Sequence, residues 1–166
     1  MRFNRHTIKG IRMKRTLKIA LIVIIVIAAA IQLIRPERFS TEMITPTDIS
    51  RSVDIPAEVK TLLDGACNDC HSDNTVWPWY SNVAPVSWLI AFDVRKGKER
   101  LNFSEWDSYS DMQKMSKFVM IDDLVGSGAM PLMPYKIMHK EARLTEEQRN
   151  TITAWAKEQI DMMENE

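Results

Sequence analysis

The only two cysteines of the 166-residue chain stand three positions apart, in the run Cys67-Asn68-Asp69-Cys70-His71. Two thiols at this spacing can add to the two vinyl groups of a haem, and a histidine directly after the second thiol can bind the iron. The pattern predicts one covalently attached haem c per chain, bound through Cys67 and Cys70. His71 is then the proximal ligand of the iron.

Two other uses of paired cysteines fit the sequence less well. A thioredoxin-type motif or local disulfide belongs to a βαβ unit, and no β-alternating run of useful length is present. A structural zinc site needs four ligands. Beyond the cysteine–histidine run, residues 36–166 offer one further histidine, His139.

The second axial position of the iron has three candidate protein ligands. Met130 and Met133 each precede a proline in the stretch 128–134, and a following proline disfavours helix and holds the backbone extended. Methionines more often fill a core than bind a metal, but this glycine- and proline-rich setting favours presentation of a sulfur. We expect Met130 to be the ligand, with His139 and Met133 as equal alternatives and an open site as the last one.

An aromatic group follows the cysteine–histidine run, namely Trp77, Trp79 and Tyr80. One interpretation is a wall beside the haem, in which an indole N–H or the Tyr80 hydroxyl reaches a propionate. The other interpretation is ordinary core packing, and the sequence favours neither.

The elements that must position these residues are helical by pattern. A helix over 56–66 runs directly into Cys67, and a second helix over 86–96 is expected to end at Gly97. The apolar side chains expected on their inner faces are Val59, Leu62, Leu63, Val86, Leu89, Ile90 and Val94.

Two capping boxes predict the remaining helices. Ser110-x-x-Gln113 begins one that ends at Gly126 or Gly128, and Thr145-x-x-Gln148 begins the last one. The side chains expected to face inward are Met112, Met115, Phe118, Val119, Leu124, Ile152, Trp155, Ala156 and Ile160. The resulting fold class is all-α, with long loops.

The N-terminal region has a different character. Residues 1–18 are basic, residues 19–35 form an apolar transmembrane anchor, residues 36–53 form a polar linker, and residues 54–166 form the haem-binding domain. The basic side of the anchor predicts a cytoplasmic N-terminus and an exported domain. A cleaved signal peptide is the alternative, because Ala28-Ala29-Ala30 offers a small-residue cleavage site.

Charge narrows the range of partners. Eight of the 22 Lys and Arg residues lie in residues 1–35, so residues 36–166 carry 14 against all 22 Asp and Glu, a net charge of −8. Nucleic acid is therefore not expected as a partner, because phosphate binding needs clustered basic residues. A redox partner with a basic docking face is expected instead.

Several strings in this chain together resemble a known family, the small haem-binding domain of c-type cytochromes in bacterial membrane and periplasmic proteins. They are CNDCHS from Cys67, TVWPWYS from Thr75, APVSW from Ala84, NFSEW from Asn102, Met130-Pro131, Tyr135, His139 and Leu144. The resemblance covers about 56–156. It implies a cytochrome c-like helical fold and covalent haem held by Cys67, Cys70 and His71.

The expected function is one-electron transfer on the outer, periplasmic side of the cytoplasmic membrane, without substrate turnover. Two protein ligands would saturate the iron and leave no site for a substrate. The alternatives are a peroxidase-like haem enzyme, which needs an open distal position, and a haem-based redox or gas sensor module.

Overall fold

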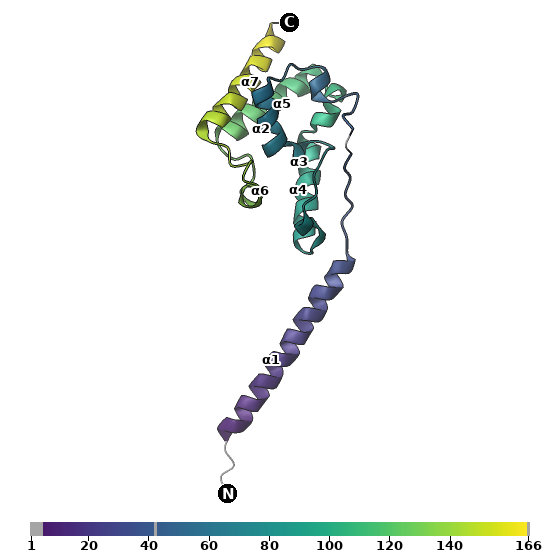
Figure 1. The fold of residues 1–166 in the computed structure, drawn as a ribbon, viewed down its shortest axis with the longest axis vertical. Coiled ribbons are helices and arrows are strands. Elements are labelled where there is room, and N and C mark those ends of the chain that lie inside the picture. Colours follow the sequence, from purple (N-terminus) through teal and green to yellow (C-terminus); the bar gives the residue numbers. More distant parts are fainter. Residues whose placement is uncertain (1–4, 42, 166) are drawn as a thin grey trace. The chain divides into compact units, whose positions relative to one another are not determined.

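The computed structural model describes residues 5–41 and 43–165, and every regular element within them is a helix (Figure 1). This confirms the all-α expectation. The chain divides into two compact units: unit 1 comprises residues 1–37 and 78–91, and unit 2 comprises residues 38–77 and 92–166.

Unit 1 contains the long helix α1 (Arg5–Ala30), which continues into the short 3-10 helix η1 (Ile31–Leu33). The part Met13–Leu33 is long and apolar enough to cross a membrane. Most of its apolar side chains are exposed. The same unit holds η3 (Trp79–Asn82) and the first turns of α4 (Val86–Arg100).

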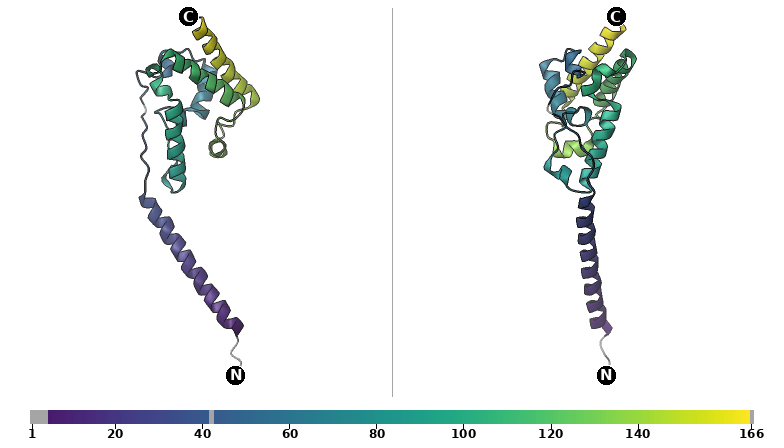
Figure 2. Two further views of the ribbon diagram at one scale, coloured as in Figure 1. Left: turned by 180° about the vertical axis from the view of Figure 1, so that it is seen from behind. Right: turned by 90° about the vertical axis from the view of Figure 1, so that its right-hand side faces the viewer.

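Unit 2 is built around the pair α5 (Asp111–Gly126) and α7 (Glu146–Glu164), which lie side by side in both views of Figure 2. Helix α2 (Ala57–Ala66) packs against α7, and α3 (Asn68–His71) packs against η4 (Phe103–Ser108). The remaining elements are η2 (Ile49–Arg51) and α6 (Met133–Met138).

Aromatic side chains form the centre of this core. The Phe118 ring lies 4.8 Å from that of Trp106 and 5.4 Å from that of Trp155, both centroid to centroid. Because one ring from each of three elements meets here, η4, α5 and α7 are fixed relative to one another. Such ring pairs add to the free energy gained from burial.

The polar segment that follows the anchor is bonded to unit 2. Ser40 Oγ donates to the Thr75 carbonyl over 2.6 Å, the Thr41 amide donates to the Asp73 carbonyl over 2.8 Å, and Ile49 is 4% exposed within the core. The expected linker is therefore held to unit 2 in its first half, at Ser40 and Thr41, and in its second half, at Ile49.

Both predicted capping boxes are confirmed. The side chains of Ser110 and Thr145 accept hydrogen bonds from the amides of Gln113 and Gln148, whose own side chains accept hydrogen bonds from the amides of Ser110 and Thr145. These reciprocal bonds satisfy donors that the first helical turn leaves unpaired.

Three details of the helix predictions are wrong. Helix α4 does not end at Gly97 but continues to Arg100. Met112 and Val119 point outward on α5, with Met112 83% exposed, while Phe118, Ile121 and Val125 form the buried face. On α4, Val86 and Leu89 are exposed and Val94 is buried.

Candidate functional site

One turn of helix places the cysteine–histidine run. Cys67 ends α2 and precedes α3, and its carbonyl accepts hydrogen bonds from the amides of Cys70 (3.1 Å) and His71 (2.9 Å). Both thiols are free and half-buried. Both sulfurs and the imidazole are therefore carried by one short stretch of backbone in unit 2.

The two thiols are held in the neutral form. Burial raises the pKa of Cys67 to about 12, and the neighbouring Cys70 adds to the effect. Burial also raises the pKa of Cys70 to about 12, with further contributions from the carboxylates of Asp69 and Asp93. A thiolate is the reactive form in redox exchange, and the raised pKa disfavours that form at neutral pH.

The orientation of His71 is fixed by a residue of another element. Its Nδ1 lies 3.0 Å from the carbonyl oxygen of Leu101, directly after α4. A carbonyl can only accept, so Nδ1 carries the proton and Nε2 keeps its lone pair. Desolvation lowers the pKa of His71, which keeps the ring neutral. A neutral imidazole bonded through one nitrogen and available through the other is the form that binds metals.

Gly97 allows α4 to lie directly against the backbone of the motif. A Cβ built on Gly97 would collide with the carbonyl oxygen of Cys70 and lie 3.2 Å from the Cys70 Cβ. The sequence pattern predicted a helix end at Gly97, whereas in the structure Gly97 lies inside α4 where the helix contacts the backbone of Cys70.

Asp69, between the two cysteines, connects the motif to α6. Its Oδ2 accepts a 2.8 Å hydrogen bond from the Tyr135 hydroxyl, and its Oδ1 accepts one from the Val76 amide over 2.9 Å. Burial and the nearby Asp69 raise the pKa of Tyr135, so the phenol stays protonated and donates. Sequence reasoning gave neither residue a role, although Tyr135 belonged to the strings that carried the family resemblance.

The three candidate distal ligands lie in and around α6. Met130 is half-buried against the core of unit 2, and its amide donates to the Leu124 carbonyl over 2.9 Å. Met133 is not in an extended loop as expected: it begins α6, and its side chain is 68% exposed. His139 follows α6, and its ring stacks on Tyr135 with centroids 3.9 Å apart.

The three aromatic residues fall into different units. Trp77 belongs to unit 2, and its indole nitrogen is buried without an acceptor among the described residues. The Arg38 guanidinium lies 5.4 Å from the centroid of the Trp77 ring. Trp79 and Tyr80 belong to unit 1, where their rings meet edge to face and Trp79 is 76% exposed.

These residues suit the chemistry of haem. Haem c needs two thiols, a neutral imidazole with one free nitrogen, and polar partners for its propionates. Unit 2 offers two free thiols, the oriented His71 ring, and the unsatisfied indole N–H of Trp77 beside a guanidinium. Within residues 5–41 and 43–165, no group of three or more His, Cys, Asp or Glu side chains gathers as a metal site.

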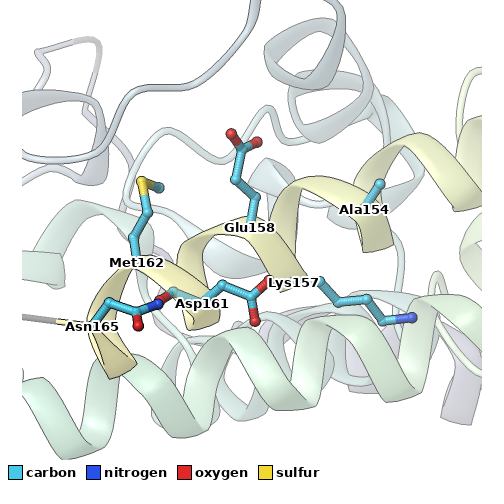
Figure 3. Close-up of a pocket in the computed structure, with 6 residues that line it drawn as sticks. All are labelled: Ala154, Lys157, Glu158, Asp161, Met162 and Asn165. Atoms are coloured by element: carbon cyan, nitrogen blue, oxygen red, sulfur yellow. The ribbon is translucent and has the colours of Figure 1, made fainter.

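A separate depression of about 600 Å³ lies along the C-terminal half of α7 (Figure 3). It is lined by Ala154, Lys157, Glu158, Asp161, Met162 and Asn165. None of the candidate haem residues lines it, and its mixed charged surface has no feature that indicates a ligand.

Comparison with known proteins gives one positive result. The model of a family described as the haem-binding domain matches residues 26–158. No curated protein and no solved structure matches the chain. The match covers most of the chain, including the cysteine–histidine run, the aromatic strings and all three candidate distal ligands. The chain therefore belongs to the haem-binding domain family.

Proposed function

We propose that this haem protein is a membrane-anchored c-type cytochrome with one covalent haem, which transfers single electrons on the outer side of the cytoplasmic membrane. The observation that carries the proposal is the arrangement of His71. Its Nδ1–H is bonded to the Leu101 carbonyl, so Nε2 keeps a lone pair that could bind iron, and two free thiols lie in the same helical turn.

Each of these residues would bind a different part of the haem. Each thiol would add its sulfur and its hydrogen across one vinyl double bond, so a C–S bond forms without net oxidation. His71 would hold the iron through Nε2, and the indole N–H of Trp77 would donate to a propionate. Bound haem would supply the one-electron couple between ferric and ferrous iron.

Covalent attachment is tested by denaturing electrophoresis after acid–acetone extraction. The protein band should keep its haem-dependent peroxidase stain, and Cys67→Ala with Cys70→Ala should lose it. Asn68→Ser lies in the same turn without changing a thiol and should keep the stain. Loss of haem to the solvent phase from the unmodified protein would contradict the proposal.

The anchor and its direction are supported by the sequence and by α1. Met13–Leu33 is long and apolar enough to span a bilayer, and the basic residues lie on its N-terminal side, which favours a cytoplasmic N-terminus. Protease added outside intact spheroplasts should digest the haem domain, and the protein should stay with membranes after alkaline washing. A shorter soluble chain beginning near Ile31 would indicate signal cleavage instead.

Electron transfer is favoured over substrate chemistry because the chain offers candidate second ligands to the iron. Met130 is half-buried against the core, and His139 stacks on Tyr135, whose hydroxyl donates to Asp69 between the two cysteines. A second protein ligand would block exogenous ligands.

The net charge of −8 in residues 36–166 should favour a basic partner. Stopped-flow mixing should show fast, salt-sensitive exchange with a basic redox protein, slow carbon monoxide binding and negligible peroxide turnover. Fast carbon monoxide binding with substantial turnover would favour a haem enzyme or sensor.

A further inference from the structure

Residues 78–91 of unit 1 present apolar side chains that nothing in the unit covers. Trp79, Val83, Val86 and Leu89 are all exposed within this short segment. Scattered exposed apolar residues need no explanation, but a concentrated group marks an interaction surface.

The segment also lacks charge. Residues 74–92 contain no Asp, Glu, Lys or Arg, although charged residues make up 27% of the chain. This run is longer than the uncharged run of the anchor, residues 19–34. A surface that meets water alone is normally rich in charged side chains, so this composition indicates a less polar environment.

Hydrogen bonds attach the segment to the end of the anchor helix. The Gln32 side chain forms a reciprocal pair with the backbone of Ala84: Nε2 donates to the carbonyl over 3.1 Å, and Oε1 accepts from the amide over 2.9 Å. The indole of Trp88 donates to the Ile34 carbonyl over 2.8 Å. Gln32 and Ile34 lie where the membrane-spanning stretch ends, so the bonded segment lies at that level too.

We infer that residues 78–91 rest in the interface of the bilayer that α1 spans, with Trp79, Val83, Val86 and Leu89 facing its lipids. The inference rests on the proposed membrane anchoring. The chemistry suits the site, because Trp is enriched at membrane interfaces, where its ring is apolar and its N–H reaches polar groups. Phospholipid is the occupant because the segment is hydrogen-bonded to the end of the apolar helix, through Gln32–Ala84 and Trp88–Ile34.

The five tryptophans provide a test in the full haem-loaded chain. The protein is labelled with 5-fluorotryptophan, reduced to avoid paramagnetic iron, and placed in phosphatidylcholine nanodiscs. Its ¹⁹F spectrum is recorded with phosphatidylcholine that carries a nitroxide near the headgroup. The Trp79 signal, assigned with Trp79→Phe, should lose intensity. The signals of Trp106 and Trp155, buried in unit 2, should keep theirs.

A variant tests the attachment to the anchor. Gln32→Leu removes the amide pair with Ala84 while keeping the span apolar, so the lipid-dependent loss at Trp79 should diminish. Leu33→Ala changes a neighbouring exposed side chain and should leave the loss unchanged. Co-flotation with the nanodisc lipid tests membrane anchoring separately from the interfacial position of residues 78–91. If the protein fails to co-float, the anchor itself is wrong. If it co-floats but Trp79 responds only to a water-soluble gadolinium chelate, the interface inference alone is overturned.

Discussion

The hydroxyl of Tyr135 donates a 2.8 Å hydrogen bond to Oδ2 of Asp69, a residue 66 positions earlier in the chain. Asp69 stands between the two cysteines of the haem motif, and Tyr135 lies between Met130 and His139. The bond therefore joins the segment that carries His71, the candidate proximal ligand, to the segment that carries the candidate distal ligands.

Tyr135→Phe should loosen this connection while keeping the ring that stacks on His139. Loss of a hydrogen bond to a carboxylate should lower the free energy of unfolding by about 1–2 kcal/mol, measured by urea denaturation. Carbon monoxide should bind the ferrous protein faster, because the distal segment is less restrained. Thr151→Val removes a hydroxyl that donates to the Glu147 carbonyl within α7, away from α6 and from the cysteine–histidine run. A similar acceleration in this control would contradict the proposed role.

Met130→Ala should remove the distal ligand. The ferric protein should lose the weak charge-transfer band at the red end of the spectrum that marks sulfur ligation, and its iron should become accessible to imidazole. Met133→Ala and His139→Ala should keep the band. If His139→Ala alone converts the iron to high spin, the pair is bis-histidine and the Met130 assignment is wrong.

Gly97→Ala should push α4 away from the motif, because the added methyl collides with the backbone of Cys70. We expect a loss of about 1–3 kcal/mol in the free energy of unfolding, as for other overpacked sites, and less haem incorporated per chain. Gly126→Ala is the matched control, since its Cβ would lie at an ordinary 3.6 Å from Thr153 Cγ2. Equal behaviour of the two variants would show that Gly97 is not a close contact.

The thiols of the haem-free protein should alkylate slowly at pH 8. Raising a thiol pKa from 9.0 to about 12 favours the neutral form, so the thiolate fraction should fall about 1000-fold. The rate with iodoacetamide should increase with pH up to about 12, and urea should restore ordinary reactivity at pH 8. Rapid alkylation of the folded protein at pH 8 would show that the thiols are not desolvated.

Phe118→Ala should destabilise unit 2 by about 3–5 kcal/mol, because it removes a ring between Trp106 and Trp155 and leaves a cavity. Met112→Ala on the same helix should change stability by less than about 0.5 kcal/mol, because that side chain is exposed. Calorimetry or urea denaturation measures the free energy of unfolding of both variants. Comparable losses would mean that Met112 packs inward as its sequence pattern first suggested.

Local signals in the sequence predicted α2, α4, α5 and α7, but not the short helix α6. The two capping boxes are fixed by residues three positions apart, so their helices could be found without tertiary information. The buried face of α5 could not, because Met112, Phe118, Val119 and Ile121 allow more than one apolar stripe. Only the positions of Trp106 and Trp155 select the stripe that contains Phe118.

In the candidate site, too, some features could be predicted from local sequence and others depend on residues far away in the chain. The spacing of Cys67, Cys70 and His71 is local and readable in the sequence. The Leu101 carbonyl that orients His71 is a backbone group 30 positions away, and no side chain identifies it in advance. Gly97 was misread for a related reason: a glycine near a helix end and a glycine against another backbone look the same in sequence.

The bonds between Ser40, Thr41 and residues 73–75 also have a mechanical consequence. Along the chain they precede the buried Ile49, so tension applied through the proposed anchor would reach them before it reached the core. Such bonds contribute only about 0.5–1.5 kcal/mol each, and they should yield first under load. Their partners Asp73 and Thr75 lie within four positions of His71, so tension on this segment would act beside the proposed iron ligand.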